Sequence, residues 1–252
     1  AKKVKIKFDA IRTDFCAGKG GNNAYLREDA ANDMVGMKKI LNELGGVLPS
    51  GGTGRSLGNY DPNNKNRSTT SFHYTYMAFD IYTHSGSLYP SANTDECEFI
   101  VTYDPEGGYP GNRMWVVWAR SDKEPGTEYE GHKVERLTLD ARVCPRGTKG
   151  QPVIKQVTGN FINLTQLFRA FNYQPIGGRT SYFKNCSSNT MGSEWWHFQH
   201  AGTPAGETWE TTMLKIHSDS RFRCSPVAKH KRRVFRNLGF SGKSKDVPWS
   251  PC

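Results

Sequence analysis

The spacing of apolar residues along the chain predicts two helices. Residues 25–46 carry apolar side chains at intervals of three and four and end in two glycines, a pattern typical of an amphipathic helix and its C-terminal stop. Residues 163–173 repeat the pattern over a shorter length, and Asn163 is placed to cap the helix N-terminus. The apolar positions are Met34, Met37, Ile40, Leu41 and Leu44 in the first helix, and Leu164, Leu167, Phe168 and Phe171 in the second.

Runs of β-prone residues predict several strands. An alternation at 4–8 predicts an opening strand, and the aromatic segment 71–83 follows a loop rich in Gly, Asn and Pro at 49–70. Segment 208–218 predicts a late strand or a short helix. Three further strands are expected at 98–104, 113–122 and 133–143. Because helices and strands mix without βαβ alternation, we expect an α+β fold: a single domain over 1–252 with a central, mainly antiparallel sheet flanked by helices.

The composition adds a strong positive charge to this picture. The 252 residues include 34 Lys and Arg against 24 Asp and Glu, a formal net charge of +10, which favours anionic partners such as nucleic acid, acidic lipid headgroups or anionic cell-wall polymers. The basic stretch "KHKRRVFR" at 229–236 has no zinc-finger, RNP or helix-turn-helix signature beside it, so we interpret it as a solvated face and disfavour nucleic-acid binding. No apolar run approaches the roughly 20 residues of a membrane helix, so no membrane span is expected.

The cysteines favour an oxidising compartment. Six of them are spread along the chain without a C-x-x-C pair, and an even count favours disulfides over buried thiols, with the pairing left open. The basic opening segment "AKKVKIKF" lacks the apolar core of a signal peptide. Two interpretations stay open, a leader already removed or a shortened chain.

Two short stretches carry the candidate chemistry. "TMGSEWWHFQH" sets Glu194 and His197 around two tryptophans, and "SFHYTYMAFD" contains His73 and Asp80. A catalytic zinc site takes three ligands from His, Asp or Glu, with an open position for water and a base near that water. Residues seven apart on a straight strand point to opposite faces, so His73 and Asp80 can meet on one ion only if the chain bends where loop and strand join.

The combined pattern of Ser-x-His-x6-Asp and a later Glu-x-x-His resembles the zinc peptidases of the D-Ala-D-Ala carboxypeptidase/dipeptidase family, and "SEWWHF" is similar to the dipeptidase branch. That family cuts peptidoglycan peptides or their precursors and shares its metal site with hedgehog-type domains. Its pattern S-x-H-x-x-G-x-A-x-D is matched at Ser71, His73, Ala78 and Asp80. It is not matched at Tyr76, where glycine is usual, so the site is expected to be narrower or differently shaped there.

The resemblance implies a metal centre. His73, Asp80 and His197 would be the zinc ligands. Glu194 would be the catalytic base, which takes a proton from the attacking water and passes it to the leaving amine. His200 is expected to be a surface or hydrogen-bonded histidine rather than an extra ligand or a proton donor.

The resemblance also implies residues that contact the substrate. The family has an arginine upstream of the first ligand, and "GGTGRS" makes Arg55 the candidate, with Arg67 as its competitor. Ser71 would bind substrate or brace the loop beside the ligand. Of the two tryptophans, one is expected in the core, and Trp195 is the candidate for a substrate contact.

The expected function is that of a zinc-dependent peptidase acting on peptidoglycan-type peptides as a carboxypeptidase, dipeptidase or endopeptidase. Such a protein would be secreted, periplasmic or delivered to the wall of a target cell. The alternatives are a metal-containing binding module without turnover and a basic nucleic-acid-binding protein. Retention of Glu194 disfavours the module, because zinc binding alone requires no base. The long stretch between the two motifs is expected to hold extra strands around 96–156, which leaves substrate size open.

Overall fold

The computed structural model describes residues 1–12, 23–55, 71–88, 96–104, 114–144, 152–176, 194–200, 209–217 and 221. Its helices are α1 (Glu28–Glu43), α2 (Leu164–Ala170) and α3 (Trp209–Ile216), with the short 3-10 helices η2 (Phe72–Thr75) and η3 (Thr83–Ser85). Within these residues, no helix is long and apolar enough to cross a membrane.

The strands of the described segments pair antiparallel. One four-stranded sheet runs in the order β11-β12-β4-β3 and a second in the order β5-β6-β10-β9. The first consists of β11 (Tyr173–Pro175), β12 (His197–His200), β4 (Ala78–Ile81) and β3 (Ser50–Gly52). The second consists of β5 (Phe99–Asp104), β6 (Met114–Arg120), β10 (Val153–Asn163) and β9 (Glu135–Val143). Two hairpins pair β1 (Lys3–Lys7) with β2 (Asn23–Arg27) and β7 (Glu128–Tyr129) with β8 (His132–Lys133).

The predicted α+β class is confirmed, but the strands form two main sheets rather than one central sheet. The second sheet is separate because β5, β6, β9 and β10 pair among themselves. Gly86, which follows β4 and η3 in the chain, forms a parallel bridge with Phe99 of β5. This bridge links the segment after β4 to the second sheet. The described parts of 96–156 contain the strands β5 to β9 and the start of β10.

Both predicted helices are present with shorter bounds. In α1 the side chains of Met34, Met37 and Leu41 are fully buried, as the apolar spacing predicts. Residues 25–27 form the end of β2 rather than the first turn of the helix, because they pair with β1. In α2 the Asn163 side chain accepts a hydrogen bond from the Gln166 N–H at 2.9 Å, as expected of an N-cap.

Of the remaining predictions, four strands are confirmed, the alternative left open at 208–218 is decided, and one long strand was missed. The strands expected at 4–8, 98–104, 113–122 and 133–143 are present as β1, β5, β6 and β9. The late segment, predicted as strand or helix, is the helix α3. The long strand β10 was not predicted, because its first four residues are all exposed and show no alternation of apolar and polar positions.

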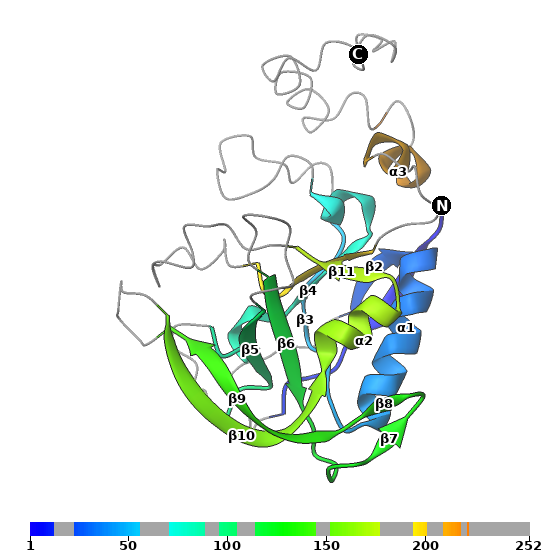
Figure 1. The fold of residues 1–252 in the computed structure, drawn as a ribbon. Coiled ribbons are helices and arrows are strands. Elements are labelled where there is room, and N and C mark those ends of the chain that lie inside the picture. The colour runs from blue at the N-terminus through cyan, green and yellow to red at the C-terminus, as the bar shows by residue number, and fades with distance from the viewer. Residues whose placement is uncertain are drawn as a thin grey trace.

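Aromatic packing between the first sheet and α2 orients the strands of the candidate site. Phe79 of β4 and Phe198 of β12 both stack on Phe168 of α2, with ring centroids 5.9 and 4.1 Å away. The helix itself lies between β6 and α1 (Figure 1). Because neighbouring strand residues point to opposite faces, Asp80 and His197 lie on the face turned away from α2.

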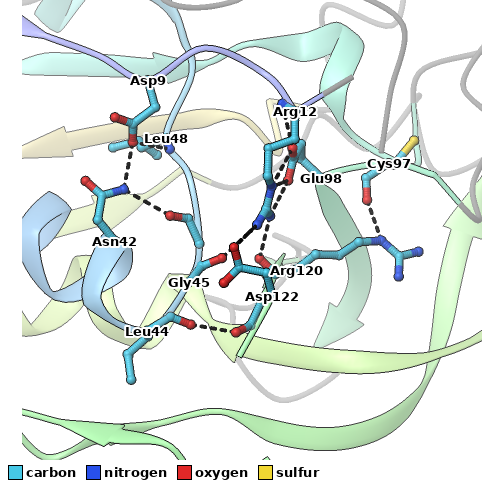
Figure 2. Close-up of polar contacts among 12 residues, drawn as sticks. Asp9, Arg12, Asn42, Leu44, Gly45, Leu48, Cys97, Glu98, Arg120 and Asp122 are labelled. Carbon is cyan, nitrogen blue, oxygen red and sulfur yellow. Dashed lines mark hydrogen bonds and ion pairs between the residues drawn. The ribbon is translucent and has the colours of Figure 1, made fainter. Parts of the chain in front are cut away.

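A buried ion pair joins the N-terminal segment to the second sheet (Figure 2). Arg12 Nη2 lies 2.7 Å from Glu98 Oε2, and the Glu98 side chain is 1% exposed. The same guanidinium donates to the carbonyl oxygens of Gly45 at 2.8 Å and Arg120 at 3.0 Å. Arg12 thereby connects the N-terminal segment to the end of α1, the start of β5 and the end of β6.

Two of the six cysteines lie within the described residues. Cys144 is disulfide-bonded, and Cys97 is a buried thiol. The other four cysteines and the basic stretch at 229–236 lie outside the described residues.

Candidate metal centre

The register of two neighbouring strands brings the first two candidate ligands together. In the antiparallel pair of β4 and β12, His197 is directly opposite Asp80. Directly opposite residues project their side chains from the same face of a sheet. His197 Nδ1 accordingly lies 2.8 Å from Asp80 Oδ1.

His73 reaches the same point through a bend in the chain. Ser71 Oγ accepts a hydrogen bond from the His73 N–H at 3.3 Å and so caps η2. Tyr76 ends this turn in the left-handed conformation, at φ 60°, before β4 begins. The bend expected between His73 and Asp80 is therefore present, and His73 Nε2 lies 3.1 Å from Asp80 Oδ2 and 3.2 Å from His197 Nδ1.

A backbone carbonyl sets the tautomer of His73. The ring Nδ1 is hydrogen-bonded to the carbonyl oxygen of Thr53, and it can only donate to that acceptor. A neutral His73 ring therefore turns the lone pair of Nε2 toward the Asp80 carboxylate. Only a cation, either a proton or a metal ion, makes this contact between two acceptors favourable.

The three side chains fit a metal ion. Their ligand atoms lie within 4.8 Å of one another, and within the described residues this is the one group of three or more His, Cys, Asp or Glu side chains that does so. Two ligand atoms on a tetrahedral zinc ion are about 3.3–3.4 Å apart, given bonds of about 2.0–2.1 Å. The separation of 3.2 Å between His73 Nε2 and His197 Nδ1 is close to that value. Each ring also lies beside one Asp80 oxygen, with His197 Nδ1 2.8 Å from Oδ1 and His73 Nε2 3.1 Å from Oδ2.

The protonation of Asp80 suits a ligand. Burial by itself would raise the pKa of Asp80, but the neighbouring rings of His73 and His197 hold that pKa well below its usual range. Asp80 is consequently an ionised carboxylate at neutral pH, which is the form that binds a metal ion.

Glu194 lies at the start of the turn that leads into His197. Its carbonyl oxygen accepts a hydrogen bond from the His197 N–H at 3.1 Å, which closes the turn. The backbone of Glu194 is left-handed, with φ 54°, a conformation uncommon for residues other than glycine. The turn is fastened to β4, because the Ile81 N–H donates to the carbonyl oxygen of Trp196 at 2.9 Å. This turn fixes the backbone of Glu194 beside that of His197, which follows it by three residues in the motif.

Both tryptophans of this turn pack in the core. Trp195 is 2% exposed and Trp196 is 4% exposed, and their rings meet edge to face at 5.8 Å. A Cβ on Gly86 would lie 2.1 Å from the Trp195 ring, so the ring packs directly on that glycine. The Trp195 ring therefore packs in the core and has almost no exposed surface for the substrate contact predicted from the sequence.

The other predicted site residues surround His73. The backbone N–H of Arg55 donates to the carbonyl oxygen of His73 at 2.9 Å, so the backbone of Arg55 lies next to this candidate metal ligand. Its competitor, Arg67, lies outside the described residues. Ser71 braces η2, which is the second of the two roles considered for it.

His200 is not part of the metal group. It lies three residues after His197 on β12, therefore on the opposite face, and its Nε2 contacts Asp33 Oδ2 of α1 at 2.7 Å. This agrees with the expectation of a hydrogen-bonded histidine. Neither Asp33 nor the Thr53 carbonyl was predicted, since a partner on a distant helix and a backbone atom leave no pattern in the sequence.

Comparisons of this chain with protein-family models, with curated proteins and with solved structures found no match.

Proposed function

We propose that this chain is a zinc-dependent peptidase that hydrolyses peptides of the peptidoglycan type. The observation that carries the proposal is the convergence of His73, Asp80 and His197 at one point, with Glu194 at the other end of the turn that delivers His197. The resemblance of the two motifs to the D-Ala-D-Ala carboxypeptidase/dipeptidase family supports the choice of reaction and of substrate.

Zinc is the metal that the donor set favours. Two imidazole nitrogens and one carboxylate oxygen are typical of catalytic zinc sites, which keep a fourth position open. When bound, zinc lowers the pKa of water to about 7 and polarises a substrate carbonyl. The Thr53 carbonyl would hold the His73 ring in the orientation that this binding requires.

Protein side chains would carry out the proton transfer and the binding of the substrate. The Glu194 carboxylate would accept a proton from the attacking water and deliver it to the leaving nitrogen of the peptide. Arg55 is half-buried beside His73 and, among the described residues, has no carboxylate partner. Its guanidinium would bind a carboxylate of the substrate, as arginine does through paired N–H donors. The net charge of +10 favours a substrate embedded in an anionic polymer.

The test is hydrolysis of purified peptidoglycan and of D-Ala-D-Ala by the full chain, with zinc supplied or removed by a chelator. We expect release of amines that depends on zinc. Glu194→Gln should lower kcat by about 10²–10⁴-fold, the usual contribution of a general base, while zinc affinity stays unchanged. The matched control is Glu128→Gln, which changes an exposed carboxylate on β7 and should leave both quantities unchanged.

Two results would overturn the proposal at different levels. Failure of the wild-type protein to take up zinc would remove both the metal site and the peptidase. Stoichiometric zinc without any hydrolysis, in the wild type as in Glu194→Gln, would leave the metal site and favour the binding module instead.

A further inference from the structure

Tyr76 holds a backbone conformation that costs a residue with a side chain. It follows η2 with φ 60°, its N–H donates to the carbonyl oxygen of His73 at 3.2 Å, and its carbonyl oxygen accepts from the Arg27 N–H at 2.8 Å. The left-handed region costs such a residue about 1–2 kcal/mol, whereas glycine enters it freely. A tyrosine here indicates that the ring makes contacts of its own.

The ring of Tyr76 packs on the glycine of a neighbouring segment. A Cβ on Gly54 would lie 2.0 Å from ring carbons Cδ1 and Cε1, so the ring occupies the space that any side chain at this position would need. The Lys3 ammonium lies 4.0 Å from the centre of the same ring. The ring is therefore held between β1 and the segment Thr53–Arg55.

This segment touches His73 on both sides of Gly54. The Thr53 carbonyl oxygen accepts from His73 Nδ1, and the Arg55 N–H donates to the His73 carbonyl oxygen at 2.9 Å. The residue between them is the one that meets the Tyr76 ring. Since Tyr76 also ends the turn that carries His73, the ring ties the turn to the segment that orients the His73 imidazole.

We propose that Tyr76 is a positioning residue of the metal centre. Its ring holds Thr53–Arg55 against η2, and through that segment it orients the His73 ring and places Arg55. The orientation of the His73 ring by Tyr76 matters for function if His73, Asp80 and His197 bind a metal ion, and it requires nothing else. The effect on Arg55 rests on the proposed peptidase function.

The first test replaces the ring without straining the backbone. Tyr76→Gly suits φ 60° and should leave the fold intact, but it removes the support of the segment. We expect the Kd for zinc to rise about 10-fold or more, the lower end for losing an outer contact of a metal ligand, and KM for D-Ala-D-Ala to rise while kcat changes less. Tyr76→Phe keeps the ring and should restore both values. Thermal unfolding of the zinc-free proteins checks that each variant is folded.

The second test asks whether the effect travels through Gly54. Gly54→Ala forces the ring to move and should weaken zinc binding by itself. Combined with Tyr76→Gly, the same change should cost little more than Tyr76→Gly alone, because the clash no longer exists. Independent, additive losses would contradict the proposed route.

The outcomes separate this inference from the proposed function. A wild-type Kd for zinc in Tyr76→Gly would overturn the positioning role even if the protein is a peptidase. A changed Kd without any hydrolysis by the wild type would uphold the role toward His73 and overturn the part that concerns Arg55.

Discussion

The metal group and the Arg12–Glu98 network are both buried, and both join segments that are far apart in the chain, yet their chemistry differs. Arg12 offers donors, and each of its three guanidinium nitrogens meets an acceptor on Glu98, Gly45 or Arg120 (Figure 2). His73, Asp80 and His197 instead turn their ligand atoms toward one another. The first network is complete within the protein, whereas the second also offers a set of ligand atoms that could hold a cation.

This difference separates a structural role from a binding role. A buried ion pair with its hydrogen bonds satisfied holds segments together and needs nothing further. A buried group whose nitrogen and oxygen atoms converge offers a cation a ligand set, and a bound cation would replace the contacts that the three side chains make with one another. The contrast predicts that variants of the two clusters affect different measurements.

The largest effect on stability is expected from Arg12→Ala. This change leaves Glu98, which is 1% exposed, as a buried charge without its partner, a situation that costs about 3–5 kcal/mol of unfolding free energy. Urea unfolding of the zinc-free protein measures it. The rise in Tm on zinc addition should equal that of the wild type.

As a control, Arg136→Ala removes an exposed arginine that contacts Asn160 and should change stability by about 0.5 kcal/mol or less. Equal stabilities of Arg12→Ala and Arg136→Ala would contradict the structural role.

A smaller effect is expected from a pair of capping variants. Ser71→Ala removes the cap of η2, and Asn163→Ala removes the cap of α2. Each should cost about 1 kcal/mol of unfolding free energy. Only Ser71→Ala should also weaken zinc binding, because only η2 carries a ligand. Isothermal titration with zinc distinguishes the two, and equal zinc affinities would show that the cap does not support His73.

The smallest effect concerns the pH dependence of α3 docking. Burial lowers the pKa of His217 below its ordinary value of 6.5, with Lys3 and Arg221 acting in the same direction, although its hydrogen bond to the Tyr74 carbonyl opposes the change. As the pH falls below about 6.5, the unfolded chain takes up the proton first, so stability decreases until the lowered pKa of the folded protein is passed.

His217→Gln should remove this part of the pH dependence. Glutamine can donate to the same carbonyl oxygen but does not titrate. Chemical unfolding of the zinc-free proteins between about pH 7 and 5 is the measurement. An identical loss of stability in the variant would assign the pH dependence to other groups.

The parts of the fold that could be predicted are those with a local signal. The buried stripe of α1 and the Asn163 cap of α2 follow from spacing and residue type alone. The strand β10 was missed because its exposed first half lacks alternation, and its pairing with β9 is a long-range contact.

The candidate site shows the same division. The three candidate ligands stand in two compact motifs, and their convergence could be expected once a bend after His73 was assumed. The Thr53 carbonyl and the Tyr76–Gly54 contact could not be expected, since both depend on where two separate loops meet. The burial of Trp195 depends on the packing of Gly86, which is also a tertiary contact.

Asp80 and His197 lie directly across from each other on neighbouring strands, and this register has a consequence for folding. A slip of β12 by one residue along β4 would turn His197 to the other face and bring an apolar neighbour to Asp80. Only the native alignment assembles all the ligand atoms, so metal binding would stabilise that alignment and none of the slipped ones. A bound ion would thus discriminate among alternative strand alignments during folding, as well as supply chemistry afterwards.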